Sequence, residues 1–278
     1  MKRWMWSLCA VVCTAVITVS AANAAGSDRG TDAPAAIPAD DGASATLMRM
    51  ADTLARAKGL KLTIRADYDV LQESGEKISY REHRSIALVR PDRLRMEVQE
   101  SNGARSTVSF DGTAITVYDP KENVYGRFDR PGTIDDAVRT LIQDLDVRLP
   151  LALLFVTTLP DELARRVIEV ERVETDVLTA VPTDHLVGRT EGVDFQVWVP
   201  VEGPALPQRV TITYKTEDGQ PQFRADLTDW IIDPDPSTAG LAFNPPADAE
   251  RIPFLLRVRR DEAGAPSKTP GSAEGAGK

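Results

Sequence analysis

The sequence predicts a mainly β protein with a few helices, an α+β fold built on a curved antiparallel half-barrel of about 11 strands. Apolar and polar residues alternate along many successive segments, which is the pattern of strands with one buried face. Turn residues such as Asn102-Gly103 and Asp111-Gly112 separate these segments, as in consecutive hairpins. Helical patterns interrupt the strands in the middle of the chain, so we expect helices to form a lid over the concave face.

The chain begins with a segment that has the three parts of a secretory signal peptide. Two basic residues come first, residues 4–20 are apolar, and Ala22-Asn23-Ala24 has the small residues of a cleavage site. We therefore expect cleavage after Ala24 and export to the periplasm, and the alternative is an uncleaved membrane anchor. Both cysteines lie in this segment, so the exported chain would have neither a disulfide nor thiol chemistry.

Beyond residues 1–24, the composition indicates one domain between two polar segments. Residues 25–44 are rich in Ala, Gly, Asp and Pro and predict a flexible leader, and residues 261–278 predict a disordered tail. Residues 45–260 form the single domain, which is long enough to bury a hydrophobic core. The net charge of −9 argues against nucleic acid or an anionic membrane surface as the main partner.

The domain opens with a helix, predicted over Ala45–Lys58 from apolar residues at helical spacing that end at Gly59. The pattern then changes to a period of two. In Leu60–Val70 the even-numbered residues are apolar and the odd-numbered ones are polar, which predicts a strand with one inward face. The same alternation predicts five more strands in this half of the domain. They are residues 76–89, 92–100, 104–111, 113–119 and 123–129.

A helical segment follows these strands. Residues 133–145 have apolar residues at helical spacing, and Asp135 and Asp136 suit the first turn of a helix. Residues 149–156 are apolar on nearly every side, and a short helical turn over residues 161–166 comes after Pro160. Strand patterns then return. They cover residues 167–173, 177–189, 194–200, 208–215 and 222–232, with a final edge strand leading into a turn or short helix within residues 241–254.

Few residues have the arrangement that catalysis or metal binding requires. The two histidines, His83 and His185, form no metal-binding motif. Asp184 could orient His185 as a general base, but no nucleophile elbow accompanies the pair, and we interpret His185 as structural. The sequence also contains no glycine-rich phosphate loop. We therefore expect no enzymatic activity, no metal and no cofactor.

A curled antiparallel sheet with an apolar concave face has two possible interiors. It closes over its own core, or it leaves a cavity for an apolar guest, and the pattern alone does not separate these. The first strands supply candidates for the wall of a cavity, and the apolar segment 149–156 supplies candidates for a removable lid. The wall candidates are Leu62, Ile64, Leu94, Met96, Val98, Val108 and Phe110, and the lid candidates are Leu151, Leu153, Leu154 and Phe155.

Two parts of the sequence resemble known families. The segment ALVRPDRLRMEV, followed by VSFDGTAITVYDP, resembles the core of the LolA/LolB-type periplasmic lipoprotein carriers, which have Arg-Pro after a strand and then an Asp-Gly hairpin. The second half, with DHLVGRTEGVDFQVWV, LPQRVTITY and FNPP, is similar to a family of predicted periplasmic proteins of unknown function that shares this fold. The resemblance extends over roughly residues 46–254.

The resemblance implies an incomplete antiparallel barrel with a helical lid over an apolar cavity. It implies that Arg90 matches an arginine that holds the lid closed through hydrogen bonds to the lid backbone. Arg90 could instead contact a lipid head group. The remaining interpretation is that Arg90 forms a surface salt bridge. The implied guest is a lipid or an acylated lipoprotein, and inner- or outer-membrane proteins are the other partners considered. The alternative function is an envelope sensor that binds a protein partner with the same barrel.

Overall fold

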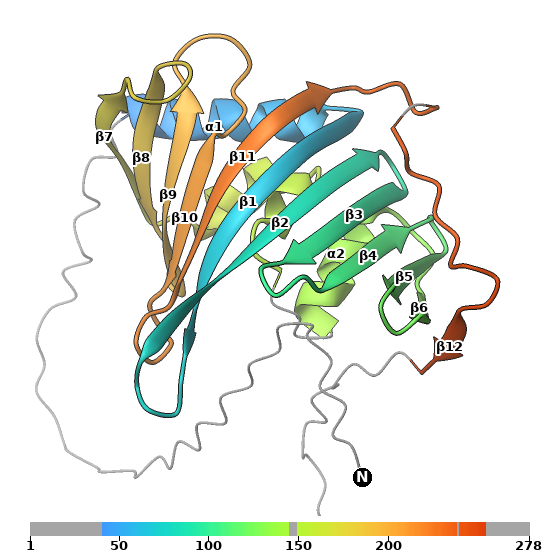
Figure 1. The fold of residues 1–278 in the computed structure, drawn as a ribbon. Helices are drawn as coiled ribbons and strands as arrows, with labels where there is room; N and C mark the ends of the chain where they lie inside the picture. Colours follow the sequence, from blue (N-terminus) through green and yellow to red (C-terminus); the bar gives the residue numbers. More distant parts are fainter. Residues whose placement is uncertain (1–40, 145–148, 238, 254–278) are drawn as a thin grey trace, which may run out of the picture.

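The computed structural model describes residues 41–144, 149–237 and 239–253, which are organised by one curved sheet (Figure 1). The sheet has 12 strands in the order β12-β6-β5-β4-β3-β2-β1-β11-β10-β9-β8-β7. Neighbouring strands are antiparallel, except for the parallel pair of β12 and β6. Because β7 and β12 lie at opposite ends of this order, the sheet stays open, which confirms the predicted α+β half-barrel. The predicted signal peptide, most of the leader and the tail lie outside the described residues.

The first six strands follow one another from the centre of the sheet to one end. The longest of them, β1 and β2, form a hairpin in which Gly59 pairs with Val89 and Leu71 pairs with Lys77. Alternation in β1 buries Leu60, consistent with the predicted inward face. The bounds are β1 Gly59–Leu71, β2 Lys77–Val89, β3 Arg93–Glu100, β4 Arg105–Phe110, β5 Ala114–Asp119 and β6 Val124–Asp129.

The second series of strands extends the sheet in the other direction. β11 pairs with β1 over Leu60–Tyr68, so the last long strand of the chain lies beside the first. The predicted strand over residues 177–189 is shorter than expected. Its first residues form a loop, because Asp176 accepts a hydrogen bond from the Leu178 backbone and Thr179 donates one to the Val181 carbonyl. The bounds are β7 Glu169–Asp176, β8 Thr183–Arg189, β9 Val193–Pro200, β10 Arg209–Tyr214 and β11 Gln222–Ile232.

The first helix, α1, spans Asp41–Arg56 and lies across the concave side of the sheet (Figure 1). It begins before the predicted start at Ala45, so the last residues of the predicted leader are helical. The reason is that Ala43 joins Leu47 and Leu54 in the core and extends the buried stripe by one turn.

The helical segment between the two strand series differs in detail from the prediction. In place of one helix over residues 133–145, α2 covers Ile134–Arg139 and a π-helical turn, η1, covers Thr140–Asp144. Thr133 and Asp136 form a capping box at the start of α2. A 3-10 turn, η2, follows over Ala152–Phe155, and α3 spans Leu159–Arg166 with Pro160 in its first turn.

The end of the described chain crosses the outer face of the sheet before its last strand. Arg95 donates hydrogen bonds to the carbonyls of Gly240 (3.2 Å) and Ala242 (3.0 Å). β12, Glu250–Ile252, then pairs with β6 at the sheet edge. The edge strand is present as predicted, but it follows the turn instead of preceding it, and residues 239–253 contain no helix.

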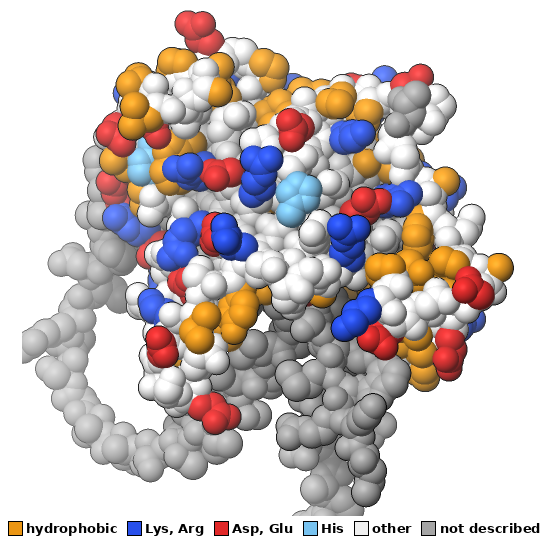
Figure 2. Space-filling view, in the orientation of Figure 1, with side chains coloured by type: hydrophobic (Ala, Val, Ile, Leu, Met, Phe, Trp, Pro, Cys, Tyr) orange, Lys and Arg blue, Asp and Glu red, His pale blue; other side chains and the backbone are white. Residues whose placement is uncertain are grey.

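A contiguous apolar core lies between the concave face and the helices, and both strand series contribute to it. The outer face of the sheet is different in character, since basic and acidic side chains are interspersed over it (Figure 2). Within the described ranges, no helix has the length and apolarity needed to cross a membrane.

Candidate ligand-binding site

Neighbouring strands build an apolar wall on the concave face of the sheet. The register places Leu62 of β1 opposite Ile86 of β2, Ile86 opposite Met96 of β3, and Met96 opposite Val108 of β4. Directly opposite residues in antiparallel strands point to the same face. The predicted wall residues therefore share one face, which we call the inner wall. They are Leu62, Ile64, Leu94, Met96, Val98, Val108 and Phe110.

The helices cover the inner wall unevenly. Leu62 and Ile64 are buried, with 2% and 0% of their surface exposed. Leu94, Met96 and Val108 pack against the same core but are only partly buried. The wall is therefore fully covered at β1 and incompletely covered along β3 and β4. Of the remaining wall residues, Phe110 is buried and Val98 is partly buried.

Residues 149–156, which we call the lid, cover the inner wall with η2 at their centre. Leu151, Leu154 and Phe155 are buried, and Leu153 is partly buried against the core. Leu151 has a positive φ of 68°, in the left-handed region, where the chain turns into η2. The lid contacts α1, α2 and α3, so the helical segments form one layer over the sheet.

Arg90 connects the end of β2 to two helical segments. Its Nη1 donates to the Phe155 carbonyl of the lid at 2.8 Å, and its Nη2 donates to the Leu54 carbonyl of α1 at 3.1 Å. Both carbonyls lie at the end of a helical segment, where no intrahelical donor is available. Burial lowers the pKa of the Arg90 guanidinium, and the nearby Asp135 carboxylate opposes this shift.

Asp135 fastens Thr157, the residue that directly follows the lid. Its carboxylate accepts hydrogen bonds from the Thr157 backbone at 3.0 and 3.1 Å and from the Thr157 hydroxyl. The start of α2 is in turn joined to the end of β2, because the Ile134 backbone donates to the Pro91 carbonyl at 2.8 Å. In the sequence, Asp135 is recognisable only as an acidic residue of a helix first turn, since nothing in the local pattern indicates its contact with Thr157.

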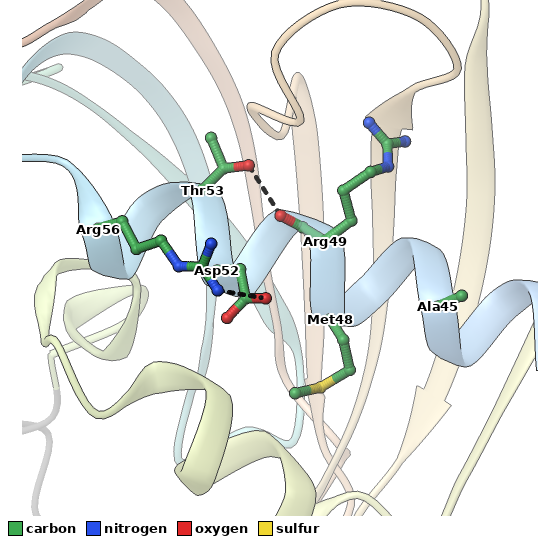
Figure 3. A pocket seen from close by; sticks show the side chains of 6 residues that line it. All are labelled: Ala45, Met48, Arg49, Asp52, Thr53 and Arg56. Carbon is green, nitrogen blue, oxygen red and sulfur yellow. Dashed lines mark hydrogen bonds and ion pairs between the residues drawn. The ribbon is translucent and has the colours of Figure 1, made fainter.

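Side chains of the lid and of the inner wall belong to one contiguous core among the described residues. Two hollows lie elsewhere. One, of about 120 Å³, lies between α1, α3 and β7. The other, of about 460 Å³, lies over one face of α1 (Figure 3). Leu154 and Phe155 of the lid belong to the same core as the inner wall, so a guest on this part of the wall would have to displace them. The residues around the larger hollow are Ala45, Met48, Arg49, Asp52, Thr53 and Arg56.

The considered pair of Asp184 and His185 is not formed, because adjacent residues of β8 point to opposite faces. The His185 ring stacks on Trp198 with centroids 4.0 Å apart, and its Nε2 lies 2.9 Å from the Gln196 Oε1. Asp184 instead accepts a hydrogen bond from Thr175. In the part of the chain that the structure describes, no group of three His, Cys, Asp or Glu residues could hold a metal ion.

Comparison with known proteins identifies a family. The model of a family described as "Predicted periplasmic protein (DUF2092)" matches residues 43–255. No curated protein matches the sequence. Among solved structures, the Mycobacterium tuberculosis lipoprotein LppX is 14% identical, with a TM-score of 0.44 over 70% of this chain and 98% of that chain.

Two further structures have similar or lower scores. LprF from Mycobacterium bovis is 9% identical, with a TM-score of 0.42 over 71% of this chain and 98% of that chain. A chain of the Pseudomonas aeruginosa MucA/MucB complex is 15% identical, with a TM-score of 0.38 over 71% of this chain and 60% of that chain.

Proposed function

We propose that this chain, which belongs to the DUF2092 family of predicted periplasmic proteins, binds the acyl chain of a lipid or of an acylated lipoprotein without covalent chemistry. The periplasmic location of the family agrees with the export expected from the sequence. The observation that carries the proposal is an apolar inner wall covered by a separate segment of chain, the lid, which few polar contacts fasten.

An acyl chain offers the inner wall the same kind of surface that the lid now provides. Burying a Leu or Phe side chain contributes about 1.5–3 kcal/mol, and burying a methylene contributes about 0.8 kcal/mol. Withdrawal of Leu154 and Phe155 would therefore be offset by about four to eight buried methylenes. A long acyl chain contains more than this, so exchange of lid for guest is energetically feasible.

The incompletely covered strip of the inner wall supplies a place for the exchange to begin. Leu94, Met96 and Val108 of β3 and β4 are apolar, face the concave side and remain partly exposed. A guest that first contacts this strip need not wait for the whole lid to leave. Release of the lid then requires loss of the Arg90 bond to Phe155, and loss of the Asp135 bonds to Thr157 would free the end of the lid.

The first test is binding of a fluorescent long-chain fatty acid to the purified protein, together with mass spectrometry of lipids extracted from it after native purification. We expect Met96→Lys, which places a charge on the inner wall, to weaken binding at least tenfold. Glu97→Lys is the matched control, since Glu97 is the next residue of β3 and faces outward. Equal affinity of the Met96→Lys variant and the wild type, or absence of lipid and of probe binding in the wild type, would contradict the proposal.

A second candidate function, the envelope sensor, is favoured by an exposed apolar edge. β7 is the last strand of the sheet and pairs with β8 alone within the described residues. Ile168, Val173 and Val177 beside or within it have 71%, 56% and 70% of their surface exposed, and Leu178 has 94%. An open edge with exposed apolar side chains favours addition of an extended segment from a partner protein.

This second function is tested with a photo-crosslinking residue at Val173 in intact cells, and with the same residue at exposed Glu73 as the control. We expect a polypeptide adduct at Val173 alone, and protection of β7 amides from hydrogen exchange when the purified polypeptide is added. Lipid in the native preparation, with no adduct specific to Val173, would reject the sensor in favour of the carrier.

A further inference from the structure

An ion pair between Glu82 and Arg84 of β2 is buried on the concave side of the sheet. Arg84 lies opposite Ile64 of β1 and Val98 of β3, so it belongs to the same face as the inner wall. Only 8% of the Glu82 side chain and 14% of the Arg84 side chain are exposed. The Arg84 guanidinium lies 5.8 Å from the centre of the Phe223 ring, against apolar surface.

The pair leaves the Arg84 Nε donor unused, and the ion pair itself is the one interaction recorded for the Glu82 Oε1 acceptor among the described residues. Arg84 Nε and Glu82 Oε1 are buried and have no hydrogen-bond partner within the described structure, although Oε1 forms the ion pair with Arg84 Nη2. Apolar side chains of similar volume often replace buried ion pairs without loss of stability. Packing of the sheet therefore does not account for charges at these two positions.

The ion pair marks the end of the apolar part of the wall. On one side of it along β2 lie Ile86 and Leu88, which are buried in the core. On the other side, toward the β1–β2 turn, Tyr68 and Tyr80 stack with ring centroids 5.9 Å apart, and Tyr80 is 40% exposed. An amphiphile whose chain lies on the wall would place its head at this boundary.

We propose that Glu82 and Arg84 bind the zwitterionic head of a phospholipid that carries an ammonium group, a proposal that rests on the lipid-binding function above. Arg84 Nε would donate to the phosphate, and Glu82 Oε1 would accept from the ammonium. A buried site that holds both signs of charge disfavours a head with net charge, because that charge would stay uncompensated.

Arg90, which the sequence suggested for a head-group contact, is engaged in another way. Two of its nitrogens donate to the carbonyls of Phe155 and Leu54 in the closed form. Arg84 is therefore the better-placed guanidinium for the head group, while Arg90 remains a candidate for holding the lid.

The experiment compares three lipids that share one acyl chain and differ in head group: lysophosphatidylethanolamine, lysophosphatidylglycerol and a monoacylglycerol. Each displaces the fluorescent fatty acid from the wild type, and we expect the zwitterionic lipid to bind at least tenfold more tightly than the other two. The double variant Glu82→Leu/Arg84→Met removes both charges together, so it leaves no unpaired buried charge. We expect it to bind all three lipids with equal affinity.

The matched control is Asp67→Leu/Arg81→Met, which removes an outward-facing ion pair from the same two strands and should keep the preference. If the first double variant unfolds, Glu82→Gln/Arg84→Gln serves in its place, since it removes charge and retains polar side chains.

The outcomes separate this inference from the function on which it rests. A wild type that binds all three lipids equally, or a double variant that keeps the preference, overturns the head-group site and leaves lipid binding intact. A wild type that binds none of them overturns both. Equally tight binding of soluble glycerophosphoethanolamine would show that the site takes a free zwitterion, and would overturn its assignment to a lipid.

Discussion

Arg90 shows how one side chain can fasten two elements that are distant in sequence. Its bonds to Leu54 and Phe155 satisfy carbonyls that would otherwise be buried without donors. Its Nε is buried and has no hydrogen-bond partner in the described residues. A guanidinium fits this place because its donors fan out in a plane toward both carbonyls.

Arg90→Met should therefore loosen the lid and destabilise the protein. We expect the free energy of unfolding to fall by about 1–3 kcal/mol, because two carbonyls lose their donors. Amides of the lid should exchange with deuterium faster than in the wild type. Arg93→Met is the control, since exposed Arg93 donates to the Asp111 carbonyl and pairs with Asp92, and neither residue belongs to the lid. Unchanged exchange in the lid would show that Arg90 does not hold it.

Asp111 carries a pH-dependent contribution at the β4–β5 turn. Burial opposes its ionisation, but hydrogen bonds from Thr113 and Ala114 and the charge of Arg127 outweigh this and lower its pKa from 3.8 to about 2. Because the pKa is lower in the folded state, the carboxylate stabilises the protein above about pH 4, and this stabilisation is lost as the pH falls toward 2.

We therefore expect Asp111→Asn to be less stable than the wild type at pH 6, and the difference to shrink between pH 4 and pH 2. Urea denaturation at a series of pH values measures this. Asp218→Asn, at an exposed position of the β10–β11 turn, controls for the general effect of removing a carboxylate. A difference that stays constant with pH would reject the assignment.

At the scale of elements, β8 and β9 show how a strand pair makes room for an aromatic ring. Gly188 lies opposite Phe195, which faces the concave side. A Cβ at position 188 would stand 2.1 Å from the Phe195 ring, so the ring occupies the space that a side chain would need. The glycine is thus required by its neighbour across the ladder and not by its own backbone conformation.

Gly188→Ala should displace the Phe195 ring and cost about 1–3 kcal/mol in the free energy of unfolding, as overpacked cores do. Gly192→Ala, in the adjacent turn, is the control because no atom lies within 4 Å of its added Cβ. Chemical denaturation compares the two variants. Equal stability of both would mean that the ring relaxes without cost.

At the scale of the whole molecule, the long hairpin of β1 and β2 joins two halves of the sheet that come from different parts of the sequence. β11 closes onto β1, and the helical segments cover the resulting concave face from one side. Since the lid, α1 and the wall share one core, the lid cannot leave unless another apolar surface takes its place.

Binding of a long-chain fatty acid should therefore have opposite effects on the two sides of the core. We expect faster amide exchange in lid residues 151–156 and slower exchange in β1 to β3, because the guest replaces the lid on the inner wall. Hydrogen exchange with and without saturating fatty acid measures both changes together. Greater protection of the lid on binding would place the guest outside the inner wall.

The faces of the strands and the start of α2 could be predicted from the sequence alone. Alternation put Leu62 and Met96 inward, because a strand fixes the direction of each side chain. The six strands, helical insertion and five strands also followed from periodicity and turn residues, since these signals are local.

The contacts between segments distant in sequence became visible in the folded structure. The pairing of β11 with β1, the contact of Arg90 with two helix ends, and the place of the lid residues in the core depend on packing summed over the whole chain. The burial of Glu82 and Arg84 was equally hidden, because a charged pair within a strand looks like a solvated face. Local spacing sets where a side chain points, and the rest of the fold sets what it meets there.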